Sequence, residues 1–211
     1  MAQIQMALDS LDFDATLALA AQVAEHVDIL EIGTPCIKHN GLKLVKALKA
    51  AHPDKIILVD LKTMDAGEYE ATPFFEAGGS ITTVLGAADM STIGGVIAAA
   101  NANGGEAQVD LIGVEDKAAV ATEAAKNGAQ IIGVHTGLDA QAAGQTPFAD
   151  LATIAGLGLD VKISVAGGIN KDTIQSCVQA GAAIVVVGAA IYGADSPADS
   201  AKELRALVDA A

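Results

Sequence analysis

The sequence has no tryptophan, few aromatic residues and only two cysteines, Cys36 and Cys177. Two cysteines provide neither a disulfide framework nor the spacing of a cysteine metal site, so we expect both to be small buried side chains. The longest uncharged segment, residues 179–194, contains three glycines and is too short for a typical membrane-spanning helix. No basic segment followed by an apolar stretch opens the chain, so no signal peptide is expected. These features predict a soluble, cytoplasmic protein that does not associate with membranes.

Basic residues are also scarce, because 12 Lys and Arg stand against 26 Asp and Glu, for a net charge of −14. Such a surface repels phosphodiester backbones, so nucleic-acid binding is disfavoured. Any anionic substrate must therefore be held by local dipoles and a few placed cations. Hydrophobic residues make up 52% of the chain and 22 residues are glycine, a composition that favours helices packed closely on strands.

Short apolar runs alternate with helical stretches along the whole chain. The runs predict strands at Ile4–Asp9, Asp28–Gly33, Ile56–Lys62, Ser80–Leu85, Gln108–Val114, Gln130–His135, Val161–Ala166 and Ala183–Val187. Helices are expected at Phe13–His26, Leu42–Ala51, Gly67–Ala77, Ser91–Ala102, Lys117–Lys126, Phe148–Ala155, Lys171–Ala180 and Pro197–Val208, with a glycine-containing loop at Thr136–Pro147.

Eight alternating strand and helix units imply a parallel sheet with helical crossovers. Eight units in about 200 residues fit a closed (β/α)8 barrel, a TIM barrel, better than an open doubly wound sheet. The open sheet is the alternative, but no GxGxxG turn follows the first strand. We therefore expect a single barrel domain over residues 1–211.

Ionisable residues stand at the carboxyl ends of five predicted strands: Asp9, Glu31, Asp60 with Lys62, Asp110 and His135. Chemistry in such barrels takes place at these ends, so all of them are candidate catalytic residues. A cap or a surface ion pair would explain any one of them, but convergence of all five at one rim favours an active site.

Glu31 and Asp60 follow neighbouring strands and are candidate ligands of Mg²⁺ or Mn²⁺, which accepts two carboxylates together with waters and substrate oxygens. The alternative is that Glu31 pairs with Lys62. The metal is favoured because Lys62 already has Asp60 and Asp65 as partners nearby in the sequence.

Lys62 is either a structural buried cation or a proton carrier that stabilises an enolate. A Schiff base is disfavoured, because acidic neighbours raise the pKa of a lysine. His135 is either a buried histidine bonded to the backbone or a general acid/base, and its position at a strand end favours the second role.

Glycines follow the last two predicted strands, and they let backbone N–H groups approach an anion near a helix N-terminus. The candidate phosphate-binding residues are Ala166, Gly167, Gly168, Gly188 and Ala189. The alternative is that these glycines only form tight turns. A phosphate held by backbone N–H groups would need no basic patch.

Several motifs together resemble the orotidine monophosphate decarboxylase superfamily. These are EIGTP at 31–35, DLKTMDAG at 60–67, VDLIG at 109–113, HTGLD at 135–139, SVAGG at 164–168, and the stretch from Gly188 to Arg205. The resemblance spans essentially the whole chain, and the DLKTMDAGE run is much more specific than DxKxxD alone. The match is to the branch that joins formaldehyde to a pentulose phosphate.

The resemblance implies a metal-dependent aldol reaction between D-ribulose 5-phosphate and formaldehyde through an enediolate. Glu31 and Asp60 would hold Mg²⁺, Lys62 would stabilise the enediolate, and His135 would transfer a proton. In the superfamily the last Asp of DxKxxD reaches into the neighbouring subunit's site. Asp65 would do so here, which implies a homodimer with shared active sites.

The closest rival within the resemblance is a decarboxylase of 3-keto-L-gulonate 6-phosphate. That relative carries arginines where this chain has Leu138 and Ala189, so the departures favour the aldol branch. Orotidine monophosphate decarboxylase is disfavoured because an arginine phosphate clamp is missing, and a pentulose-phosphate epimerase because only His135 stands at the rim. A non-catalytic barrel that binds a sugar phosphate is the alternative of another class.

Overall fold

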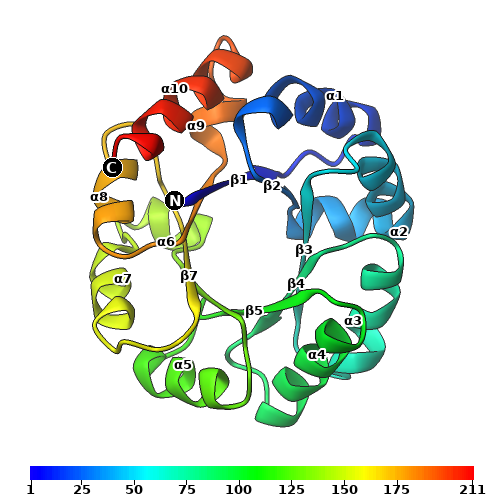
Figure 1. Cartoon of the computed structure of the whole chain (residues 1–211), viewed down its shortest axis with the longest axis vertical. Helices are drawn as coiled ribbons and strands as arrows, with labels where there is room; N and C mark the ends of the chain where they lie inside the picture. Colours follow the sequence, from blue (N-terminus) through cyan, green and yellow to red (C-terminus); the bar gives the residue numbers. More distant parts are fainter.

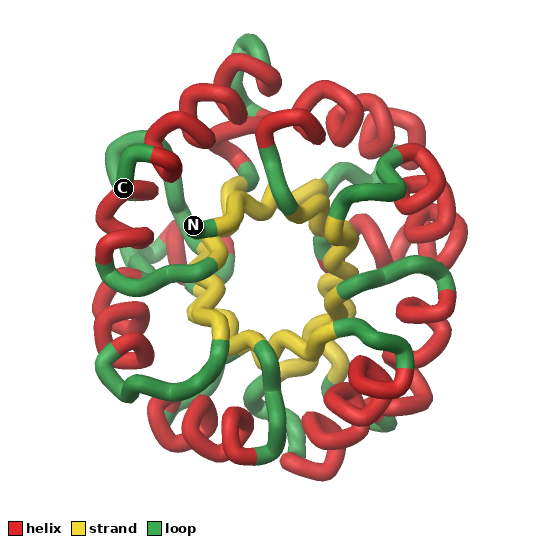
Figure 2. Tube along the Cα trace, in the orientation of Figure 1, coloured by secondary structure: helices red, strands yellow, loops and turns green.

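The computed structural model describes all 211 residues as a closed barrel of parallel strands in the order β1 to β8. The strands are β1 (Gln3–Leu8), β2 (Ile29–Ile32), β3 (Ile56–Thr63), β4 (Ile81–Leu85), β5 (Glu106–Asp110), β6 (Ile131–His135), β7 (Lys162–Ala166) and β8 (Ile184–Val187). Figure 1 and Figure 2 show the strands as an inner ring with the helices around it. The predicted (β/α)8 barrel is therefore confirmed, and the open sheet is excluded.

The helices form the outer layer. They are α1 (Phe13–Val23), the 3-10 turn η1 (Ala24–His26), α2 (Thr34–Ala51), α3 (Gly67–Glu76), α4 (Met90–Ala102), α5 (Lys117–Lys126), α6 (Leu138–Ala142), α7 (Phe148–Ala155), α8 (Ile174–Gln179), α9 (Ala189–Tyr192) and α10 (Pro197–Asp209). No helix combines the length and the apolar character needed to cross a bilayer.

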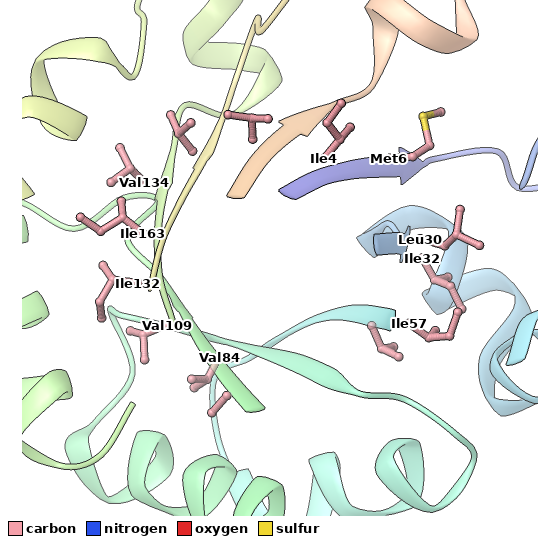
Figure 3. Packing of buried hydrophobic residues seen from close by; sticks show 14 of the residues in the cluster. Ile4, Met6, Leu30, Ile32, Ile57, Val84, Val109, Ile132, Val134 and Ile163 are labelled. Atoms are coloured by element: carbon pink, nitrogen blue, oxygen red, sulfur yellow. The ribbon is translucent and has the colours of Figure 1, made fainter. Parts of the chain in front are cut away.

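Side chains alternate along each strand, and this alternation divides the buried residues into two groups. The larger group lies between strands and helices, and Figure 3 shows members such as Ile4, Leu30 and Val109. Both cysteines belong to it, as expected. The smaller group fills the barrel interior with Ile29, Leu58, Ile81, Ile131 and Ile184. Branched side chains of this kind make the interior a packed core rather than a pore.

Three helical segments differ from the sequence prediction. Helix α2 begins at Thr34 instead of Leu42, because Pro35 suits a helix start, and two helical segments meet at Gly41 with φ 58°. A short helix at Leu138–Ala142 lies in the segment predicted as a loop, and another at Ala189–Tyr192 lies where no element was predicted. Helices this short carry too little periodicity to be recognised in a sequence.

Candidate active site

A cavity of about 1340 Å³ opens at the carboxyl ends of the strands. It is lined by all the predicted site residues except Asp65: Asp9, Glu31, Asp60, Lys62, Asp110, His135, Ala166, Gly167, Gly168, Gly188 and Ala189. The strand-end pattern therefore located the residues that the fold brings together.

Lys62 has a left-handed backbone conformation with φ 49°, uncommon for a residue with a side chain. Strand register shifts between Val59 and Thr63 at this point, which marks an irregularity in β3. The Lys62 ammonium lies 3.1 Å from Asp60 and 2.5 Å from Asp110. The expectation that Asp65 pairs with Lys62 is wrong, because Asp65 follows the bend and Asp110 reaches the ammonium from β5.

The pKa values of this ion cluster follow from burial opposed by charge pairing. Burial alone lowers the pKa of Lys62, but Asp60 and Asp110 together raise it above its usual range. Burial likewise raises the pKa of Asp110, but His135 and Lys62 lower it to about 2. The two nearby carboxylates thus stabilise the Lys62 ammonium, which disfavours the free amine that a Schiff base requires.

Two threonines hold Asp60 in place, and neither was singled out from the sequence. Thr34 Oγ1 donates to Asp60 Oδ2 at 2.5 Å, and Thr83 Oγ1 donates to Asp60 Oδ1 at 2.7 Å. Thr83 also accepts the backbone N–H of Lys62 at 2.9 Å, so one hydroxyl orients Asp60 and the strained Lys62 backbone together. The alternation along β4 turns Thr83 inward, a signal that was available in the sequence.

Glu31 is buried, and its partner is Gln5, whose amide donates to Glu31 Oε2 at 2.7 Å. Burial, with the charges of Asp60 and Asp9, raises the pKa of Glu31 to about 8. No ion pair joins Glu31 to Lys62, so that alternative is not supported. Glu31 is instead a buried carboxyl group without a positive partner in the chain.

Asp9 lies beside this group at the end of β1. Partial burial and the neighbouring Asp60 carboxylate raise the pKa of Asp9 above its ordinary value. The Asp9 carboxylate lies over Gly33, where an added Cβ would come within 2.0 Å of Asp9 Oδ1. Gly33 is thus required for Asp9 to occupy its place at the rim.

His135 and Asp110 form a hydrogen-bonded pair, with 3.0 Å between His135 Nδ1 and Asp110 Oδ2. The Lys62 ammonium lies 3.5 Å from the same nitrogen, too far for a good hydrogen bond. Asp110 therefore selects the tautomer with a proton on Nδ1, and Nε2 remains available to accept a proton. The backbone-bonded alternative for His135 is not what the structure contains.

The turns after β7 and β8 present free backbone donors. The N–H groups of Gly167, Gly168 and Gly188 make no hydrogen bond within the chain. Gly167 and Gly168 have φ values of 121° and 71°, so both positions favour glycine over other residues. Close approach of several N–H groups is what a phosphate requires in a chain of net charge −14.

Asp65 is the predicted site residue that lies elsewhere. It is exposed, and it accepts the N–H of Ala66 at 2.8 Å instead of facing the cavity of its own chain. Met64, next to it in the sequence, and Tyr69, four residues further on, are 53% and 85% exposed. Leu138 lines the cavity mouth with 76% of its surface exposed.

A parallel barrel with a lysine, a histidine and several carboxylates at its carboxyl rim defines a (β/α)8-barrel enzyme. Residues 2–204 match the family model described as "Orotidine 5'-phosphate decarboxylase / HUMPS family". The chain belongs to this family.

Among relatives, the chain is 67% identical over 207 residues to the 3-hexulose-6-phosphate synthase of Methylomonas aminofaciens, covering 98% of this chain and 99% of that one. The crystal structure of the 3-hexulose-6-phosphate synthase from Salmonella typhimurium has a TM-score of 0.96 at 38% identity, with 99% of each chain covered. The 3-keto-L-gulonate-6-phosphate decarboxylase from Vibrio cholerae has a TM-score of 0.88 at 30% identity, covering 99% of this chain and 98% of that one.

Proposed function

We propose that this chain is a 3-hexulose-6-phosphate synthase, an aldehyde-lyase that condenses formaldehyde with D-ribulose 5-phosphate and also runs the reverse reaction. The observation that carries the proposal is the 67% identity over nearly the full length to a relative of that name. Leu138 supports the synthase over the decarboxylase, because the resemblance implies an arginine at this position in the decarboxylase. The solved decarboxylase from Vibrio cholerae is 30% identical to this chain. The cytoplasmic location expected from the sequence stays a prediction.

The donor set fits a divalent cation of the Mg²⁺ or Mn²⁺ type, with Glu31 and Asp60 as its ligands. Asp9, Glu31 and Asp60 place three mutually repelling carboxyl groups together, while the one lysine there already pairs with Asp60 and Asp110. A cation would relieve this repulsion and favour the ionised form of Glu31. No group of three or more His, Cys, Asp or Glu side chains is arranged to hold an ion by itself. Two protein carboxylates completed by oxygens from outside the chain are a usual arrangement for Mg²⁺.

When bound, such a cation supplies Lewis-acid polarisation of the sugar's carbonyl group. The chain's own residues do the rest. His135 Nε2 takes the C1 proton while Asp110 holds the imidazole, and the Lys62 ammonium stabilises the negative charge of the enediolate. C1 then bonds to the formaldehyde carbon, the sugar carbonyl reforms at C2, and the formaldehyde oxygen takes the proton back from His135 Nε2 to give the hexulose 6-phosphate. The free N–H groups after β7 and β8 hold the phosphate.

A homodimer with shared sites completes the proposal. Asp65 lies outside the cavity of its own chain, beside the exposed Met64 and Tyr69. Exposed apolar side chains next to an unused carboxylate suit a surface that a second copy covers. Asp65 would then enter the partner's cavity.

The proposal is tested by following formaldehyde with and without D-ribulose 5-phosphate and Mg²⁺ or Mn²⁺. We expect consumption only when the sugar phosphate and the metal are both present, and Lys62→Ala should keep the fold but lose most turnover. Release of carbon dioxide from 3-keto-L-gulonate 6-phosphate, measured in parallel, compares the rival reaction. A folded, metal-loaded protein that leaves formaldehyde untouched would rule out the synthase.

A further inference from the structure

One level of the barrel interior, just below the active-site rim, is polar. The side chains at this level are Gln5, Leu58, Gln108 and Ser164. In the strand register each of them pairs with one isoleucine of the interior core on the next strand, and these isoleucines form the next level down. Such levels usually hold branched apolar residues. The three polar members are no more than 8% exposed, and all three line the active-site cavity. A buried polar group without a partner costs about 1–3 kcal/mol, so each of them requires an explanation.

The amide N–H of Gln5 is explained by its hydrogen bond to Glu31, although Gln5 Oε1, like Gln108 Oε1, is enclosed without a partner. Gln108 and Ser164 have no such role, because neither side chain makes a hydrogen bond within the chain, and Gln108 Oε1 is enclosed without a partner. The amide N–H of Gln108 and the hydroxyl of Ser164 are therefore donors available to a molecule inside the cavity.

The Gln108 amide can be located relative to the reacting groups. A Cβ added at Gly133 would lie 3.1 Å from Gln108 Nε2, so the amide extends across β6 at Gly133. Gly133 precedes His135 by two residues, and Gln108 precedes Asp110 by two. Gly133 is also the register partner of Asp110, so the amide lies beneath the pair of His135 and Asp110.

We infer that Gln108 and Ser164 form the binding site for formaldehyde, an inference that rests on the proposed function. Formaldehyde has two heavy atoms, carries no charge and can only accept hydrogen bonds. An amide N–H and a hydroxyl next to an uncharged floor match those properties. Held there, its carbon lies between the floor and the cluster of Lys62 and His135, where the C1 carbanion of the sugar forms.

The test separates the two substrates kinetically. Exchange of the C1 hydrogen of D-ribulose 5-phosphate with deuterium from D2O reports enediolate formation without formaldehyde. Loss of one neutral hydrogen bond corresponds to about a three- to tenfold change in binding, so Gln108→Met and Ser164→Ala should each raise the KM for formaldehyde by that factor. The KM for ribulose 5-phosphate and the exchange rate should stay at the wild-type values.

Gln5→Met is the matched variant, since it makes the same change at the same level but removes the donor to Glu31. With Gln5→Met, the exchange of the C1 hydrogen and the condensation with formaldehyde should both become slower. The inference is overturned if Gln108→Met and Ser164→Ala leave the KM for formaldehyde unchanged, as they would if only water occupies the floor. It is equally overturned if exchange falls in step with condensation. If Gln108→Met does not fold, the KM for formaldehyde of Ser164→Ala decides the test by itself. Failure of the proposed function would be recognised separately, because the wild-type protein would then catalyse no condensation.

Discussion

Two neighbouring threonines on β4 have opposite surroundings at the scale of single residues. Thr83 faces inward, accepts the Lys62 N–H and donates to Asp60, whereas the buried Thr82 hydroxyl has no partner. The charged carboxylate and the left-handed Lys62 backbone both depend on Thr83. A partnered and an unpartnered hydroxyl next to each other on one strand allow a controlled comparison.

We expect Thr83→Val to lower kcat/KM by about 10–100-fold, the usual cost of removing a group that orients a ligand or catalytic residue. It should also lower the free energy of unfolding by about 1–3 kcal/mol, because the Lys62 N–H loses its acceptor. Thr82→Val should leave activity unchanged and stability equal or higher, since it removes an unpaired polar group. Thr83→Ser should restore activity, and an inactive Thr82→Val or a fully active Thr83→Val would contradict this assignment. Steady-state kinetics and urea unfolding measure both effects.

The ionisable site residues were predictable because each follows an apolar run that ends at one rim of a parallel barrel. Gln5, Thr34 and Thr83 were not, because neither a polar residue inside an apolar strand nor one at the start of a helix indicates which carboxylate it will meet. The partner of Lys62 was wrongly predicted for a related reason. Asp65 is close to Lys62 in the sequence, but Lys62 and Ala66 both have positive φ, and the resulting bend directs Asp65 away from the cavity. The actual partner, Asp110, lies 48 residues further along the chain.

The turn after β7 illustrates what an element contributes to the site. An added Cβ at Gly167 would lie 2.6 Å from the Thr136 carbonyl oxygen, while one at Gly168 would meet nothing closer than Gln141 at 3.5 Å. Both positions have positive φ, so any substitution carries a conformational cost. Only Gly167 also packs against the end of β6.

Gly168→Ala should therefore cost about 1–2 kcal/mol of stability, the price of a left-handed conformation with a side chain. Gly167→Ala should cost more, and it should also raise the KM for ribulose 5-phosphate more than Gly168→Ala does, since the turn must move away from Thr136. Thermal unfolding and sugar-phosphate titration measure these effects. Equal costs at the two positions would mean that the close approach to Thr136 is unimportant.

Strands and long helices were predictable as elements from apolar runs and glycine stops, and apart from the start of α2 no end is displaced by more than four residues. The start of α2 was missed because Gly41 interrupts the periodicity that would have connected its two segments. Helices α6 and α9, at the mouth of the cavity, are five and four residues long. Their positions depend on contacts with the barrel, which a local pattern does not contain.

At the scale of the whole molecule, the count of eight units was enough to predict the closed barrel that the structure contains. Asp65 and the exposed Tyr69 do not line the cavity of their own chain, and the proposed dimer surface would cover them.

Subunit mixing tests the shared site directly. Asp65→Ala and Lys62→Ala should each be inactive alone, because each breaks both sites of a homodimer. After exchange of subunits, the mixed dimer contains one site with neither change, so up to about half of the activity of a wild-type dimer should return. Continued inactivity after exchange has been demonstrated, for example by mass spectrometry of differently tagged subunits, would mean that Asp65 acts within its own chain or not at all.

The isoleucine cluster below the polar level closes the barrel at its amino-terminal end. Molecules consequently enter and leave through one mouth, and everything that carries a phosphate must pass the same N–H groups after β7 and β8. Pentulose and hexulose phosphates cannot occupy this single entrance together. In the proposed reaction, accumulated product therefore acts as a competitor of the sugar substrate, and the net flux through the enzyme depends on how quickly the hexulose phosphate is removed from solution.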